Sequence, residues 1–347
     1  MSDVTGPSSR LAAAVAAFVL LGVGLAAGIL LLTQPGAPLN PTPRFVGIEA
    51  VTLLGDGDLI AVGRTRGWTD PGLIARSTDG GRLWLVAAVP VPGMTAVASA
   101  GSRLVASRYC LPPMAGGTPF GPAPTSCLFA SDDRGVTWRD LDAGTLVDPT
   151  FADANYGWAH EQFPNGRSLF ETTDGGLSWS GLDTPCPVDK PMLFRAVATG
   201  RQSGYLLCFG EATETGQPWS LMRRSASGET ATLFEANLSN GEPHQGLHDE
   251  FVKGFSLNPA GSGLAWTSHL YKTMDGGRSW TTVDTSDLGS GGFGEGGFVI
   301  DAENAYLVWG TPAKSSIIEY RAGVFRTLVT WPWSIVADLL GQPEAGA

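Results

Sequence analysis

From residue 45 onward, apolar residues occur in short runs or alternate with polar residues, and Gly, Pro, Asn or Asp bounds each run. This pattern predicts β-strands, because successive side chains of a strand point to opposite faces and turn residues end it. The first four of these runs predict strands at 46–54, 59–64, 72–77 and 83–89. No convincing amphipathic helix interrupts the rhythm, so residues 45–330 indicate an all-β domain.

A different pattern precedes this domain: residues 11–32 are uncharged and mostly apolar. As a helix the run would be about 33 Å long, enough for the hydrocarbon core of a bilayer. We therefore expect a transmembrane signal-anchor helix at 11–33. The alternative is a cleaved signal peptide, whose apolar region is shorter, at about 7–15 residues.

Basic residues around this run predict its orientation. Arg10 precedes it, and the next Lys or Arg is Arg44. The positive-inside rule then puts residues 1–10 in the cytoplasm. We expect a single-pass protein of the cell membrane, with every residue after 33 on the extracytoplasmic side.

Two further features belong to this leader. Gly24 and Gly28 have the spacing of closely packed membrane helices, so a homodimer through this helix face is one interpretation. The other is that Gly is simply frequent in membrane helices. Residues 34–44 contain four prolines, which favours a stiff, extended linker that holds the β-domain away from the membrane.

One eight-residue pattern recurs four times in the β-domain, with a hydroxyl residue first, Asp third, Gly fifth and Trp eighth. An Asp carboxylate accepts backbone N–H bonds in such a turn, Gly takes a positive φ, and Trp begins the next strand. Each copy therefore predicts a hairpin with a structural role. The copies are Ser77, Asp79, Gly81 and Trp84; Ser131, Asp133, Gly135 and Trp138; Thr172, Asp174, Gly176 and Trp179; and Thr273, Asp275, Gly277 and Trp280.

These octets resemble the Asp-box (BNR) repeats of the sialidase-like superfamily and of propellers similar to photosystem II assembly factors. In those families the box joins the two outer strands of a four-stranded blade, so the resemblance implies a β-propeller. The repeat spacing of about 45 residues agrees with this. We expect six blades, at 46–89, 94–142, 147–182, 192–236, 251–284 and 298–328, of which the fourth and sixth have lost the box.

The end of the chain leaves the number of blades open. A seven-bladed propeller is the alternative if residues 331–337, which include Trp331 and Trp333, belong to a further sheet. In the six-bladed interpretation, residues 331–347 are a ring-closing segment and tail.

The composition of the chain limits the kinds of partner that it can bind and the cellular compartments in which it can lie. The net charge of −11 disfavours a nucleic-acid partner, because phosphate binding needs a basic surface. Arg greatly outnumbers Lys, which hints at a bacterial genome rich in GC. All four cysteines follow residue 33, where disulfides are permitted. We expect bridges between Cys110 and Cys127 and between Cys186 and Cys208, with four free buried thiols as the alternative.

If strands alternate in direction, all the boxes lie on one face of the ring. The long connections at 111–126, 183–191, 211–218, 237–250 and 284–297 then lie on the opposite face, which we call the loop face. Loops often carry function, so we expect the ligand there. The candidate residues are His244, His248, Asp249 and Glu250. Pro243 and Gly246 argue against a helix that would align the two imidazoles, so we expect no metal site and no cofactor.

Sialidase chemistry needs three Arg around a carboxylate, a Tyr nucleophile assisted by Glu, and an Asp acid. The sequence around Arg44 departs from the family's Arg-Ile/Leu-Pro motif, and nothing in their spacing singles out Arg103, Arg195, Arg223 or Tyr320. The resemblance thus implies architecture rather than a reaction. We expect a non-catalytic binding or assembly scaffold for a protein or cell-envelope ligand, with an exo-sialidase or other glycoside hydrolase as the alternative.

Overall fold

The computed structural model describes residues 47–64, 71–108, 110, 126–162, 168–183, 186–211, 216–239, 247, 251–311 and 314–332. The chain divides into two units, Met1–Thr42 and Pro43–Ala347, and all described residues belong to the second. The expected membrane helix at 11–33 and linker at 34–44 lie outside them. Within the described part of the chain, no helix has the length and apolar character needed to cross a membrane.

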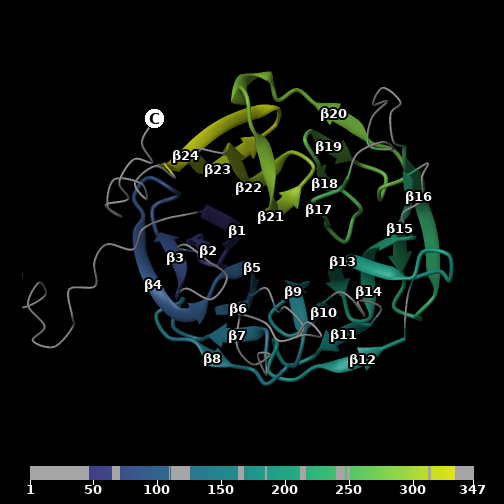
Figure 1. The fold of residues 1–347 in the computed structure, drawn as a ribbon, viewed down its shortest axis with the longest axis horizontal. Helices are drawn as coiled ribbons and strands as arrows, with labels where there is room; N and C mark the ends of the chain where they lie inside the picture. Colours follow the sequence, from purple (N-terminus) through teal and green to yellow (C-terminus); the bar gives the residue numbers. More distant parts are fainter. Residues whose placement is uncertain are drawn as a thin grey trace, which may run out of the picture. The chain divides into compact units, whose positions relative to one another are not determined.

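The described strands form six four-stranded antiparallel sheets, each made of four consecutive strands (Figure 1). Blade 1 is β1 (Gly47–Leu53), β2 (Leu59–Arg64), β3 (Pro71–Ser77) and β4 (Leu85–Pro92); blade 2 is β5 (Met94–Ala100), β6 (Arg103–Arg108), β7 (Leu128–Ser131) and β8 (Arg139–Asp140); blade 3 is β9 (Leu146–Phe151), β10 (Gly157–Glu161), β11 (Leu169–Thr172) and β12 (Ser180–Leu182). Blade 4 is β13 (Met192–Gly200), β14 (Ser203–Phe209), β15 (Gly216–Arg224) and β16 (Thr230–Ser239); blade 5 is β17 (Gly254–Leu257), β18 (Gly263–Trp266), β19 (Leu270–Thr273) and β20 (Thr281–Val283); blade 6 is β21 (Gly292–Asp301), β22 (Asn304–Thr311), β23 (Lys314–Arg321) and β24 (Val324–Pro332), preceded by the short 3-10 helix η2 (Ser286–Leu288).

The first strand of every blade lies at the centre of a ring (Figure 1). These inner strands pack on one another in order, β1 on β5, β5 on β9, β9 on β13, β13 on β17 and β17 on β21, and β21 packs back on β1. Each of the six interfaces between blades has its own cluster of buried apolar side chains. The expected all-β, six-bladed propeller is therefore confirmed, and the described residues form no seventh sheet.

Blades 1 and 6 close the ring by packing, since each is built from one continuous stretch of chain. On the outside, the rings of Trp84 and Trp331 meet edge to face at 5.7 Å between centroids. Trp331 is part of β24, which ends at Pro332, so the outer strand of blade 6 runs beyond residue 330. The expected boundary between propeller and ring-closing segment was therefore placed too early.

Several loops predicted on the loop face are shorter than expected, because β15 begins at Gly216, β16 ends at Ser239 and β21 begins at Gly292. The glycines near residue 295 resemble a loop in sequence, yet they form an inner strand. A side chain at Gly296 would collide with Ala50 of blade 1. Glycine in this strand marks the close approach of two backbones rather than a turn.

Candidate functional site

The four Asp boxes form one kind of turn, and blade 1 shows its geometry. The Gly81 N–H donates to Ser77 Oγ at 2.8 Å, and Ser77 Oγ donates to Asp79 Oδ1 at 2.8 Å. Asp79 Oδ1 also accepts the Leu83 N–H at 3.0 Å. Trp84 Nε1 then donates to the Gly81 carbonyl at 3.0 Å, which fixes the indole against the turn. Side chains thus satisfy the backbone groups that a ladder would otherwise pair.

The other boxes repeat these bonds with small differences. In each, the fifth-position N–H donates to the first-position hydroxyl. Trp138 and Trp280 donate to a box carbonyl as Trp84 does, whereas Trp179 Nε1 has no hydrogen-bond partner. The fourth position also has a positive φ, and in blade 2 a non-glycine, Arg134, adopts it with φ of 62°.

Every box also touches the preceding blade. A side chain at Gly135 would collide with Ile74 of blade 1, and one at Gly277 would meet Leu221 of blade 4. Gly81 of the first blade lies in the same way against Leu328 of the last. The box glycines therefore allow close packing between blades as well as the turn itself.

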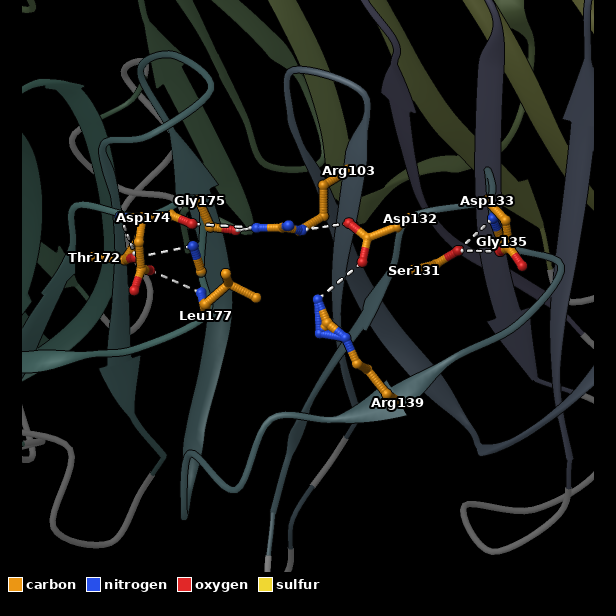
Figure 2. A network of polar contacts seen from close by, with 11 residues as sticks. Arg103, Ser131, Asp132, Asp133, Gly135, Arg139, Thr172, Asp174, Gly175 and Leu177 are labelled. Carbon is orange, nitrogen blue, oxygen red and sulfur yellow. Dashed lines mark hydrogen bonds and ion pairs between the residues drawn. The ribbon is translucent and has the colours of Figure 1, made fainter.

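Arg103 links two neighbouring boxes, as Figure 2 shows. Its Nε donates to Asp132 Oδ1 at 2.6 Å in the box of blade 2, and its Nη1 donates to the carbonyls of Asp174 and Gly175 in the box of blade 3, each at 3.2 Å. Arg139 donates to the other oxygen of Asp132 at 2.9 Å. The box face thus holds neighbouring blades together with polar contacts.

The two disulfides lie toward the opposite, loop face. Cys110 is joined to Cys127 with 5.8 Å between the Cα atoms, and both pack on Val147 of blade 3. Cys186, in the connection from blade 3 to blade 4, is joined to Cys208 of β14. These are the two pairs named from the sequence, and no cysteine is free.

The predicted ligand residues His244, His248, Asp249 and Glu250 lie outside the described residues, so their arrangement stays a prediction. Of the same connection, Leu247 is described and buried. The described residues contain no group of three His, Cys, Asp or Glu side chains that would hold a metal ion.

Sequence reasoning missed a cavity on the ring axis. Its volume is about 250 Å³, and it is lined by the inner strands of all six blades. Most of its lining is small or apolar, but Asp148 of β9 and Arg195 of β13 contribute charged side chains. A signal was present in the sequence, because Asp148 interrupts an apolar run that begins an inner strand.

Asp148 lies between two basic side chains. His160 Nε2 is 3.4 Å from Asp148 Oδ2, and Arg195 Nη2 is 4.0 Å from the same oxygen. Burial alone would raise the pKa of Asp148, but the neighbouring Arg195 guanidinium and the His160 imidazole outweigh it and lower this pKa to about 2. The carboxylate is therefore ionised at neutral pH.

The backbone aims Asp148 into this position. A β-bulge interrupts the pairing of β9 and β10 between Trp158 and His160, and Asp148 has a φ of 50°. The Asp148 N–H donates to Ser107 Oγ of blade 2 at 3.2 Å. Bulges redirect side chains, and non-glycine residues at positive φ are costly, so both features are typical of functional sites.

Three of the four residues considered for sialidase chemistry, Arg103, Arg195 and Tyr320, have separate partners. Arg103 binds the boxes and Arg195 faces Asp148, as described above. Tyr320 is buried in blade 6, with its hydroxyl 3.4 Å from Glu303 Oε2. These contacts do not bring the candidate residues together around one carboxylate.

No protein-family model matches the sequence. The chain is 27% identical over 158 residues to the photosystem II assembly lipoprotein Ycf48 of Synechococcus sp., which covers 44% of this chain and 42% of the relative. It is also 27% identical over 243 residues to a probable oligoxyloglucan-reducing end-specific xyloglucanase of Neosartorya fischeri, covering 64% of this chain and 28% of that protein. These matches span less than half the length of each relative.

Among solved structures, Ycf48 bound to a D1 peptide is similar, with a TM-score of 0.43 and 14% identity over 85% of this chain and 88% of that one. At this level a structural likeness concerns the fold alone. The match to the Synechococcus protein agrees with the resemblance expected from the boxes. By its six sheets and by its sequence, the chain is a six-bladed β-propeller similar to Ycf48.

Proposed function

We propose that the chain is a non-catalytic assembly scaffold that binds a protein partner through its loop face. The observation that carries this proposal is the 27% identity to Ycf48, a protein described by its role in assembly. The fold agrees with such a role, since a propeller offers a rigid ring whose connecting loops vary freely.

A partly exposed aromatic cluster beside blade 4 supports the choice of face. Val188, in the connection from blade 3, is 98% exposed. Phe251, in the connection to blade 5, is 47% exposed and stacks on Phe194 and Phe209 at 5.2 and 5.6 Å between ring centroids. A preordered aromatic side chain at a surface is a typical anchor of a protein interface.

The proposal includes a single-pass membrane anchor at residues 11–33, with the propeller outside the cytoplasm. The uncharged run and Arg10 before it support this orientation. The two disulfides agree with it, because disulfides persist in oxidising, extracytoplasmic compartments. Protease treatment of intact cells tests it: the propeller is expected to be accessible, and protection of it would contradict the orientation.

Affinity capture tests the binding role. The tagged full-length chain, solubilised from its native membranes, is expected to retain a stoichiometric protein partner. Val188→Asp and Phe251→Ala should each lower its recovery several-fold. Leu83→Asp is the matched control, since Leu83 is 76% exposed on the box face. Equal loss with this control, or no partner at all, would contradict the proposal.

The match to a xyloglucanase favours glycoside hydrolysis as the second candidate. Incubation of the full-length chain with fluorogenic sialosides, other fluorogenic glycosides and xyloglucan oligosaccharides is expected to give no turnover. Hydrolysis that survives purification to homogeneity would replace the scaffold proposal with this one.

A further inference from the structure

We propose that the cavity on the ring axis, which we call the central channel, binds a small zwitterion. Arg195 would hold its carboxylate and Asp148 its ammonium group. A free α-amino acid has this chemistry. The site lies on the ring axis rather than on the exposed loop face, so the inference does not depend on the proposed partner.

Arg195 has the donors that a carboxylate needs. Its side chain is 14% exposed and lines the channel. Its Nε has no hydrogen-bond partner, and its Nη2 is 4.0 Å from Asp148, beyond hydrogen-bond distance. The guanidinium therefore keeps donors that no side chain of the described residues satisfies, and a bound carboxylate could accept from its terminal nitrogens in planar geometry.

Asp148 supplies the complementary charge. Its side chain is 23% exposed and also lines the channel. His160 Nε2 and Arg195 Nη2 both approach Asp148 Oδ2, at 3.4 and 4.0 Å, so Asp148 Oδ1 can accept a donor from a bound ammonium group. The adjacent positive and negative groups, 4.0 Å apart, match the short separation between the two charged groups of an α-amino acid.

The size of the channel limits the ligand. Its 250 Å³ is below the roughly 300–1,000 Å³ of sites that hold drug-sized molecules. Thr150 and Thr199 also line the channel from blades 3 and 4, and Ala96 and Ala98 line it from blade 2. A short side chain therefore fits best, and a long peptide is disfavoured.

Calorimetric titration of the full-length chain in detergent tests this inference. The probes are L-alanine, L-serine and L-glutamine, with acetate and methylammonium as single-charge controls. We expect at least one amino acid to bind, and each control to bind at least about tenfold more weakly, because it makes one of the two charged contacts. No binding by any amino acid, or equal binding of acetate, would overturn the inference.

Variants locate the binding. Arg195→Gln and Asp148→Asn should each weaken amino-acid binding at least about tenfold. Ala98→Leu should do the same by filling the channel from blade 2, and it keeps the test decisive if removal of a charge unfolds the protein. Arg139→Gln, on the outer strand β8, is the matched control and should bind as the unaltered chain does. Unchanged affinity in all three channel variants would overturn the inference.

Discussion

Blades with and without an Asp box hold their outer strands in different ways. In blades 2, 3 and 5, which have the box, the outer strands β8, β12 and β20 contain two, three and three residues. In blades 4 and 6, which lack it, β16 and β24 contain ten and nine. The box thus replaces a long backbone ladder with side-chain hydrogen bonds. Blade 1 has both, a box and an eight-residue β4.

The pairing of strands shows which residues of blades 4 and 6 occupy the positions of the missing box. Thr172 and Thr273, which begin boxes, pair with Gly157 and Gly263. The corresponding residue of blade 4 is Arg224, which pairs with Gly204. In blade 6 the turn is reduced to two residues with positive φ, Ala322 and Gly323, the geometry of a tight hairpin. In blade 6, a tight turn and a long backbone ladder hold the outer strand in place of a box.

The largest expected effect comes from the packing between blades. Gly135 and Gly323 have nearly equal φ values of 89° and 87°, but a side chain would collide with Ile74 at the first and meet open space at the second. Gly323→Ala should cost about 1–2 kcal/mol from backbone strain alone. Gly135→Ala should cost a further 1–3 kcal/mol, roughly, from overpacking. Urea unfolding of the two variants measures the difference, and equal costs would show that the box acts within its own blade only.

The second effect concerns the carboxylate of the box. Asp133→Ala removes the acceptor of Ser131 Oγ and of the N–H and hydroxyl of Thr137 in the blade with the shortest outer strand. We expect a loss of about 1–2 kcal/mol, measured by urea unfolding. Asp79→Ala should lower the free energy of unfolding less than Asp133→Ala does, because the eight-residue β4 remains paired. The reverse order would contradict the view that box and ladder substitute for each other.

The third prediction concerns the loss of stability at low pH. Hydrogen bonds from the Thr137 hydroxyl and N–H lower the pKa of Asp133 from 3.8 to about 2, and those from Ser279 lower the pKa of Asp275 to about 2. A carboxyl with a lowered pKa in the folded state adds stability above its unfolded value. This contribution is lost as the pH falls from about 4 through 2. Unfolding free energies across this range should fall less steeply in Asp133→Asn than in the unaltered chain.

The smallest effects come from the charges on the box face. Arg103→Gln removes contacts to two blades and should cost about 1 kcal/mol. Arg139→Gln breaks one exposed ion pair with Asp132 and should cost less than about 0.5 kcal/mol. Thermal unfolding compares them; similar values would mean that Arg103 contributes little across the interface.

The sequence predicts the blades well because their signals are local. The alternation of apolar residues and the four boxes each lie within one or two strands, so the inner and outer strands of blade 1 appear close to where they were expected. The glycines of β21 were misassigned to a loop because their role depends on Ala50, a residue at the other end of the chain. The channel pair was missed for the same reason, since Asp148 and Arg195 meet only when blades 3 and 4 pack together.

The contact of β21 with β1 has a consequence for biosynthesis. A ribosome delivers blade 1 first, and this blade can pair its own strands at once. The apolar surface that it presents toward blade 6, including Ile48 and Val51, stays uncovered until the last strands emerge. Nascent chains that stall before β21 therefore expose this apolar surface of blade 1, so truncation late in the chain should promote aggregation.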